Sequence, residues 1–354
     1  MVPRERAKGG RAMSVTLRQI AEETGISIST ISRVTTGKGY VAEETRKAVE
    51  EAIERLNYAR RKPLPQVRKD NDDVVMIMVG GIRSSLAAHI VEQLVQELNK
   101  KRKRSFMAIT NFSPERERSY LKFAADNHFF GIISMTITET PETLSMLRNF
   151  PCPLVMVERY LPSMDNDCLR SDCYRMGFLG AEYLIENGHT KIGFIGGSRD
   201  STITQDKKTG FMDCMLSRGL APREEWIIHM DRLIYENGID VANQLMALDD
   251  RPTALVSSND ISVSILNELI SRGVRVPEDI SICNCEDSQM ATHCQVPLTS
   301  MRVDFSRMAA DAVKTLCRRR RQPSMPRSQL IYNPQLIERH SVQNLVTGRN
   351  AAEN

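Results

Sequence analysis

Short apolar runs alternate with amphipathic segments along most of the chain, from residue 74 to residue 283. The runs are rich in Val, Ile and Met, and the segments between them repeat their apolar residues at helical spacing. Uninterrupted apolar strands separated by helices are typical of parallel sheets with both faces covered. Strands are predicted at 74–79, 106–109, 131–134, 154–157, 192–195, 226–228, 254–257 and 280–283. Helices are predicted at 88–100, 114–127, 141–149, 174–187, 205–218, 238–248 and 260–272.

About four of these strand–helix units precede residue 160 and four follow it, which is too many for a single compact layer. The pattern therefore predicts an α/β core of two doubly wound lobes. Ligands bind such sheets beyond the carboxyl ends of the strands. The loops predicted to face each other across a cleft follow Val79, Ser134, Val157, Ile195, Ser257 and Cys283.

Residues 15–58 lack strand-like alternation and predict three short helices. A capping-box pattern begins at Thr16, Gly25 ends the first helix, and the second helix begins at Ser27. The third helix is expected over 43–56. Two helices joined by a short turn containing glycine are typical of the helix-turn-helix, whose second helix enters the major groove of DNA. An ordinary three-helix domain remains the alternative at this stage.

The charge is distributed unevenly along the chain. The 354 residues carry a net charge of +4, but residues 1–69 hold 15 Lys and Arg against 8 Glu, so the remainder is −3. Clustered cations suit a polyanion such as DNA, although a solvated basic surface fits equally well. A second basic run, Arg318 to Arg321, follows a helix predicted over 305–317. It either contacts nucleic acid or balances the helix C-terminus, and the second interpretation is favoured.

Several classes of protein are excluded by what the sequence lacks. No stretch approaches the roughly 18 apolar residues of a membrane-spanning helix, and no apolar segment follows the basic residues 1–12. We therefore expect a cytoplasmic protein without a membrane partner, whose eight cysteines are free thiols. The sequence has no GxSxG elbow, no GxxxxGK[ST] loop and no spacing typical of a metal site. We expect no catalytic residues, no cofactor, no metal and no enzymatic activity.

The run VTLRQIAEETGISISTISRV (15–34) resembles the DNA-binding head of the LacI/GalR family of bacterial transcription regulators. The similarity continues at GHTKIGFIGG (188–197), RGVRVPEDISI (272–282) and NPQLIERHSV (333–342), so it covers nearly all of residues 15–342. The resemblance implies a transcriptional regulator, most simply a repressor, that binds a near-palindromic double-stranded DNA operator as a homodimer. It also implies a periplasmic-binding-protein-like core that senses a small molecule.

The resemblance places DNA contacts on the second helix. Ile28, Ser29 and Arg33 match the family's base-reading positions. Arg33 can make a bidentate contact to guanine, whereas Ile28 is limited to an apolar contact such as a thymine methyl group. Thr16, Ser27, Thr30 and Ser32 suit phosphate contact or capping, and Leu17 is a further predicted DNA-binding residue.

The linker is where the chain departs most from the family. Family members carry a hinge helix whose leucine enters the minor groove, whereas the matching run here is Leu64-Pro65-Gln66-Val67. A proline inside a helix costs about 3 kcal/mol, and Val67 is a smaller wedge than leucine. We expect an atypical hinge, with Leu64 and Val67 as its candidate minor-groove contacts, and either weaker coupling between head and core or DNA binding without a strong central bend.

Effector contacts are predicted from the resemblance at Asp172, Lys207, Asn259 and Glu286. Lys207 stands where the family commonly has arginine, and Glu286 lies in a run that departs from the family's Gly-[Phe/Tyr]-Asp-Asp. Paired carboxylates that face a cation suit a hydroxyl-rich ligand. Because lysine offers a point charge rather than a planar fork, a sugar, a sugar acid, a sugar phosphate and another polar metabolite all remain open. A purely structural role for Lys207 and Glu286 also remains open.

The predicted order of domains is an N-terminal extension (1–14), a helix-turn-helix domain (15–58), an atypical hinge linker (59–73), a bilobal effector-binding and dimerisation domain (74–342) and a tail (343–354). A start at Met13 would match the family, so residues 1–12 are an upstream start or a basic arm. The tail lacks the heptads of a coiled coil, which favours a dimer. The competing hypothesis is a solute- or partner-binding module without specific DNA recognition.

Overall fold

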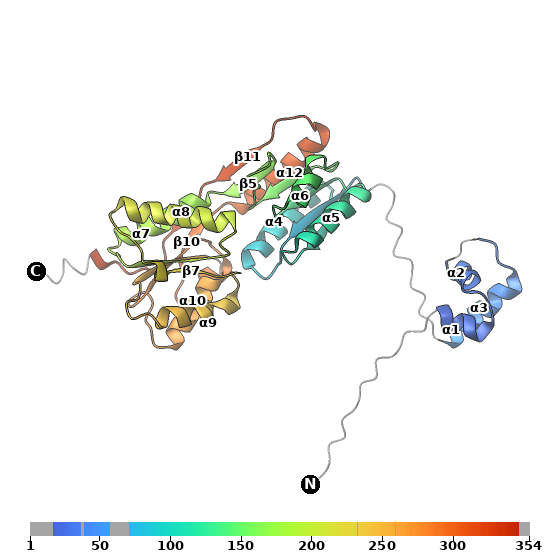
Figure 1. Ribbon diagram of the computed structural model, residues 1–354, viewed down its shortest axis with the longest axis horizontal. Helices are drawn as coiled ribbons and strands as arrows, with labels where there is room; N and C mark the ends of the chain where they lie inside the picture. Colours follow the sequence, from blue (N-terminus) through green and yellow to red (C-terminus); the bar gives the residue numbers. More distant parts are fainter. Residues whose placement is uncertain (1–16, 37–38, 57–70, 232, 259, 347–354) are drawn as a thin grey trace, which may run out of the picture. The chain divides into compact units, whose positions relative to one another are not determined.

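The computed structural model describes residues 17–36, 39–56, 71–231, 233–258 and 260–346. The chain divides into two compact units, a head within residues 1–68 and a core within residues 69–354, which are drawn in Figure 1. None of the helices in the described ranges is both long enough and apolar enough to span a membrane.

The head consists of α1 (Leu17–Thr24), α2 (Ile28–Thr36) and α3 (Glu43–Arg55). These helices bury a small apolar core that includes Ile20, Ile31, Val34, Val49, Ala52 and Ile53. Gly25 ends α1 with a φ of 69°, a left-handed conformation that glycine adopts without strain. The backbone N–H of Thr30 donates to Ser27 Oγ at 3.2 Å, so Ser27 caps α2. The predicted helix-turn-helix is therefore confirmed.

The first lobe of the core, called here the N lobe, is built on a six-stranded sheet in the order β11-β5-β4-β3-β1-β2. All of its strand pairs are parallel. Its strands are β1 (Val74–Val79), β2 (Arg104–Ile109), β3 (Gly131–Ser134), β4 (Leu154–Val157), β5 (Asp167–Ser171) and β11 (Gln329–Tyr332). Its helices are α4 (Ser85–Lys100), α5 (Pro114–Asp126), α6 (Pro141–Arg148) and α12 (Phe305–Arg321).

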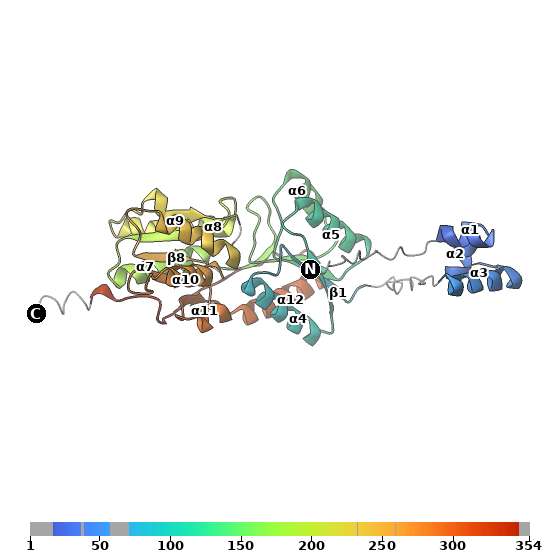
Figure 2. The ribbon, with the colours of Figure 1, turned by 90° about the horizontal axis from the view of Figure 1, so that it is seen from below.

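Both faces of the N-lobe sheet are covered, which explains why β1 is apolar at every position. Val75, Ile77 and Val79 pack on the face covered by α4 and α12. Val74, Met76 and Met78 point to the opposite face and pack with α5 and α6. Figure 2 shows α4 and α12 side by side on their face of the sheet.

The second lobe, called here the C lobe, has a six-stranded sheet in the order β12-β10-β9-β8-β6-β7, in which only the β10–β12 pair is antiparallel. Its strands are β6 (Ile192–Gly196), β7 (Ile227–His229), β8 (Ala254–Ser257), β9 (Ser281–Asn284), β10 (Thr299–Arg302) and β12 (Gln335–Ile337). Its helices are α7 (Cys173–Glu186), α8 (Thr202–Ser217), α9 (Gly238–Met246), α10 (Ile261–Ser271) and α11 (Gln289–His293), with short 3₁₀ turns η1 (Glu224–Trp226) and η2 (Tyr235–Asn237). The predicted fold of two doubly wound lobes is confirmed.

The structure corrects several element boundaries. The sequence pattern missed β5, β10, β11 and β12, because these short strands mix polar with apolar residues, as in DCLRS. The segment predicted as a strand over 226–228 begins at Ile227, since Trp226 lies in a 3₁₀ turn. The helix predicted to end at Cys317 continues through Arg321. The last turn consists of arginines, of which Arg319 is buried. Because the prediction followed apolar residues alone, it ended the helix one turn too early.

Arg319 ties the end of α12 to β5 and to the loop before β11. Its side chain is 4% exposed, and its Nε and Nη2 atoms donate to the fully buried Asp167 carboxylate at 2.8 and 3.0 Å. It also donates to the carbonyl oxygens of Pro323 and Pro326, at 2.8 and 2.9 Å. A buried arginine with this many partners fixes the path of the chain from α12 to β11.

Arg319→Ala is therefore expected to lower the free energy of unfolding by about 3–5 kcal/mol, because it leaves a buried carboxylate without its main partner. Urea titration of the purified protein measures this change. The neighbouring Arg318→Ala, at an exposed position, is the matched control and should stay within about 0.5 kcal/mol of the parent. Equal destabilisation by the two substitutions would contradict the structural role of Arg319.

Candidate functional site

The predicted reading helix α2 presents a polar, basic outer face. Ile31 and Val34 are buried in the head, whereas Ile28 is 48% exposed and Ser29 and Arg33 are also exposed. Ser27 Oγ lies 2.9 Å from both Ser29 Oγ and Thr30 Oγ1. The three candidate base readers therefore share one accessible helix face, with the capping hydroxyls at its start.

The remaining predicted DNA contacts are placed differently. Leu17 is half-buried against the apolar core of the head, and Ser32 is half-buried on α2. Thr16 and the two hinge candidates, Leu64 and Val67, lie outside the described residues. All these positions stay predictions.

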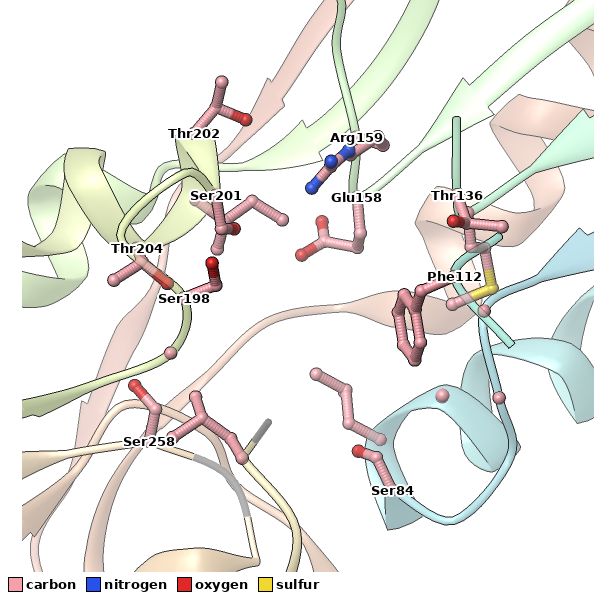
Figure 3. Close-up of a pocket in the computed structure, with 18 of the residues that line it drawn as sticks. Ser84, Phe112, Thr136, Glu158, Arg159, Ser198, Ser201, Thr202, Thr204 and Ser258 are labelled. Atoms are coloured by element: carbon pink, nitrogen blue, oxygen red, sulfur yellow. The ribbon is translucent and has the colours of Figure 1, made fainter. Parts of the chain in front are cut away.

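A cavity of about 890 Å³ lies between the two lobes of the core. It is lined by residues that directly follow strands of both sheets, including Gly80 after β1, Met135 after β3, Glu158 after β4, Gly197 after β6 and Ser258 after β8. Figure 3 shows Glu158 and Arg159 directed into the cavity, toward Ser198 and Ser201 of the C lobe. The predicted cleft at the carboxyl ends of the strands is therefore present.

Lys207 and Glu286 form a buried ion pair in the cavity wall. Lys207 Nζ lies 2.7 Å from Glu286 Oε1 and 3.3 Å from Ser258 Oγ, and the two charged side chains are only 5% and 8% exposed. Burial by itself lowers the pKa of Lys207, but the Glu286 carboxylate, together with the nearby Cys173 and Cys285, outweighs burial and raises this pKa above its usual value. The ammonium group therefore stays charged, and its partner within the protein is Glu286.

Glu158 is a second carboxylate of the cavity wall, and it was missed in the sequence. It follows β4 with a φ of 53°, and its Oε1 accepts from Ser171 N and Ser171 Oγ at 2.6 and 2.8 Å. Burial raises the pKa of Glu158, while the Ser171 hydrogen bonds and the Lys207 charge oppose this rise. A left-handed glutamate at a strand end is a strained conformation of the kind found at binding sites. No local sequence pattern signals it.

Arg159 is the cation of the cavity for which the described residues provide no hydrogen-bond or ion-pair partner. It lines the cavity, and burial lowers its pKa, an effect opposed by the charges of Glu117 and Glu139. Thr202, also in the lining, has a buried hydroxyl without a hydrogen-bond partner in the described part of the chain. Buried polar groups normally have partners, so the Thr202 hydroxyl and the half-buried Arg159 guanidinium are suited to contact a polar ligand.

Two predicted effector residues are not brought to the cavity by the described structure. Asp172 lies at the N-cap of α7, where its carboxylate accepts from Arg175 N at 2.9 Å, and it is absent from the cavity lining. Asn259 lies outside the described residues. A ligand contact by either residue stays a prediction. In the described ranges, no group of three or more His, Cys, Asp or Glu is arranged to hold a metal ion.

Two glycines position Lys207 by allowing α7 and α8 to approach closely. A Cβ atom on Gly177 would lie 1.9 Å from the carbonyl oxygen of Lys207. A Cβ atom on Gly210 would lie 1.9 Å from the carbonyl oxygen of Tyr174. Each glycine therefore touches the backbone of the other helix, and Lys207 sits at this contact.

The two lobes of the core contact each other at two places. Asp260 is 3% exposed and does not cap its own helix, α10. Its carboxylate instead accepts from the N–H and hydroxyl groups of Ser85, the first residue of α4 in the N lobe, with the N–H bond at 2.7 Å. Arg83 pairs with Glu236 beside it. At a separate contact, Asp206 of α8 lies 3.5 Å from Arg170 and accepts from the Tyr160 hydroxyl.

Comparison with known proteins assigns both units. The model of bacterial regulatory proteins of the lacI family matches residues 16–61, and the model of periplasmic binding protein-like domains matches residues 181–342. The head is thus similar to the DNA-binding domain of the LacI family, and the core is similar to periplasmic binding protein-like domains. The chain is a DNA-binding transcriptional regulator of this type, with a helix-turn-helix head and a periplasmic-binding-protein-like core.

The chain matches these curated relatives over nearly their whole length. The HTH-type transcriptional repressor PurR of Pasteurella multocida (strain Pm70) is 28% identical over 330 residues, which cover 93% of this chain and 98% of the relative. PurR of Haemophilus influenzae (strain PittEE) is 26% identical over 335 residues, covering 94% and 99%. These relatives are named as transcriptional regulators rather than as enzymes.

Solved structures share the fold. The transcriptional regulator CelR in its complex with cellobiose superposes with a TM-score of 0.70 at 24% identity, covering 92% of this chain and 99% of CelR. The lac repressor dimer bound to operator and the anti-inducer ONPF gives a TM-score of 0.69 at 18% identity, covering 93% and 99%.

Gly210→Ala is expected to destabilise the core by at least the roughly 1–3 kcal/mol typical of overpacking, because the new methyl group meets backbone rather than a mobile side chain. Chemical unfolding measures this change in stability. Thr209→Ala, at the exposed neighbouring position, is the control and should cost far less. An unchanged stability for Gly210→Ala would show that the α7–α8 contact is looser than described.

Proposed function

We propose that this regulator represses transcription as a homodimer on a near-palindromic operator, and that a small hydroxyl-rich metabolite in the cleft controls it. The DNA-binding part of this proposal rests on α2. Ile28, Ser29 and Arg33 are exposed on this helix, whereas its opposite side is buried in the head. Two such helices related by a two-fold axis match two half-sites in successive major grooves.

Among the residues on this face, Arg33 is expected to contribute most to base specificity, because its guanidinium group can donate to both acceptors of a guanine. Arg33→Ala should cost about 1–3 kcal/mol on the selected operator and relax the preference at one base position of each half-site. Selection from random duplexes, followed by titration of parent and variant, measures both effects.

Lys47→Ala, which removes an exposed cation of α3, is the matched control and should weaken binding uniformly or not at all. If the parent protein enriches no motif with or without a metabolite extract, the competing hypothesis of a solute- or partner-binding module replaces the regulator.

For the effector, the charges of the cavity favour a neutral sugar over a sugar phosphate. Among the described lining residues, the cations are Arg83, Arg159 and Lys207, and the carboxylates are Glu139, Glu158, Asp200, Asp231 and Glu286. Lys207 and Arg83 are already paired with glutamates. A dianionic phosphate in the cavity would therefore be attracted mainly by Arg159 and repelled by several carboxylates.

The uncharged part of the wall also suits a sugar. Ser198, Ser201, Thr202 and Ser258 line the C-lobe side, and the N-lobe side presents the ring of Phe112, which Figure 3 shows directed at the cavity. Hydroxyl and carboxylate groups of the wall can form hydrogen bonds with the hydroxyl groups of a sugar, and an apolar ring can pack on the C–H face of the sugar. The cavity volume lies within the usual range of about 300–1,000 Å³ for small-molecule sites.

Glu158→Gln tests the cleft without changing its shape. We expect a thermal-shift panel to stabilise the parent with a neutral sugar more than with the matching sugar acid or sugar phosphate. The variant should then bind the stabilising sugar about tenfold or more weakly, because it loses a charged hydrogen-bond acceptor.

Glu142→Gln, on the exposed surface of α6, is the control and should keep the parent affinity. A panel in which only phosphates or acids stabilise the parent would overturn the neutral-sugar assignment and leave the DNA-binding proposal intact.

A further inference from the structure

A dense group of cations covers the end of the N lobe that lies opposite the cleft. The cleft lies at the carboxyl ends of the parallel strands, so this end carries their amino ends and the C-termini of α4 and α12. We define the basic pole as Lys100, Lys101, Arg102, Lys103, Arg104, Arg318, Arg319, Arg320, Arg321 and Arg327.

Contacts bring several residues of the pole together although they come from distant parts of the sequence. Lys103 Nζ lies 3.6 Å from the centre of the Phe130 ring, and Arg320 lies 5.8 Å from the same centre. Arg320 also pairs with Asp72, whose carbonyl oxygen accepts from Lys103 Nζ at 3.0 Å. At the base of the group, the buried Arg319 and the half-exposed Arg327 share the Asp167 carboxylate, at 2.8 and 3.7 Å.

The positive charge of the pole exceeds what its neighbours neutralise. The carboxylates paired with the ten cations are Asp72, Asp73, Glu97 and Asp167. Two helix C-termini contribute only about half a negative charge each. Residues 70–354 hold 33 Lys and Arg against 36 Asp and Glu, so the core outside the pole has 23 cations against 32 carboxylates. An acidic core thus concentrates an excess of about five positive charges at one end.

The peptide that comes from the head joins the core at this same end. Asn71 is the first core residue described, and its Nδ2 donates to the Asn127 carbonyl oxygen at 3.0 Å, directly before Asp72 and Asp73 contact the pole. Fifteen residue-to-residue steps between Leu56 and Asn71 span at most about 50 Å. This peptide therefore keeps any DNA that the head binds near the end of the core that carries the basic pole. The tether favours DNA as the ligand of the pole over a freely diffusing acidic protein.

We propose that the basic pole binds the phosphate backbone of the DNA that the head engages. This inference rests on the proposed DNA binding by the head, and it adds a sequence-independent contact made by the core. Phosphate contacts release counterions, so they raise affinity on every sequence and steepen its dependence on salt. The core would then increase residence on DNA without altering which operator is chosen.

The salt dependence of binding by the full-length protein tests this proposal. One variant combines Arg318→Ser and Arg321→Ser, and another combines Lys101→Ser with Arg102→Asn, since asparagine tolerates the left-handed φ of 54° at that position. These four side chains are exposed and make no ion pair with described residues. Affinity for the selected operator and for a random duplex is measured from low to moderate salt.

Each double variant should flatten the slope of log K against log salt on both duplexes. The expected change is about 0.9 for each DNA phosphate that the variant no longer neutralises, up to about 2 in total. The selected motif should stay the same. The control, Arg116→Ser with Lys122→Ser on exposed positions of α5 in the same lobe, should keep the parent slope.

If both pole variants keep the parent slope of log K against log salt, the basic-pole proposal is overturned, whether or not an operator is selected. A parent that shows no motif, together with pole variants whose slopes are flatter, overturns the proposed operator recognition and keeps the phosphate contact by the core. The two proposals therefore fail separately.

Discussion

The polarity of the parallel strands is the constraint on which the core depends. Because neighbouring strands run the same way, every strand of a lobe delivers its carboxyl end to one edge and its amino end to the other. Loops that carry Glu158, Ser198 and Ser258 are thereby gathered at a single cleft, although they are far apart in sequence. The same polarity sends the C-termini of α4 and α12 to the opposite end, where Lys and Arg are favourable. One topological rule thus separates the acidic cleft from the basic pole.

Strand and helix positions followed from the sequence where burial is two-sided. β1, β3, β4 and β8 are apolar at almost every residue and matched their predicted bounds, because helices cover both faces of each sheet. β5 was missed because Asp167 is an integral part of it, held by Arg319 across a long sequence separation. Such a strand depends on a tertiary ion pair, which a window of a few residues does not contain.

The candidate site was only partly predictable for the same reason. Lys207 and Glu286 were predicted from a resemblance, and the structure brings them together at 2.7 Å across 79 positions of sequence. Asp172 has a suitable side chain, but its carboxylate is used to cap α7. Glu158 has no local motif, since its role depends on a left-handed backbone and on Ser171 from the next strand. Residues with suitable side chains could therefore be chosen from the sequence, whereas the partner of each side chain depends on the fold.

The cap that Asp260 supplies to α4 connects the cleft with the far end of the N lobe. α4 has 16 residues, so it forms a rod about 24 Å long, with Ser85 at the cleft and Lys100 in the basic pole. Separating the lobes would remove an acceptor from the first turn of this rod, a change typically worth about 1 kcal/mol. A movement at the ligand end would then reach Lys100 as a displacement of the whole helix rather than as a local deformation.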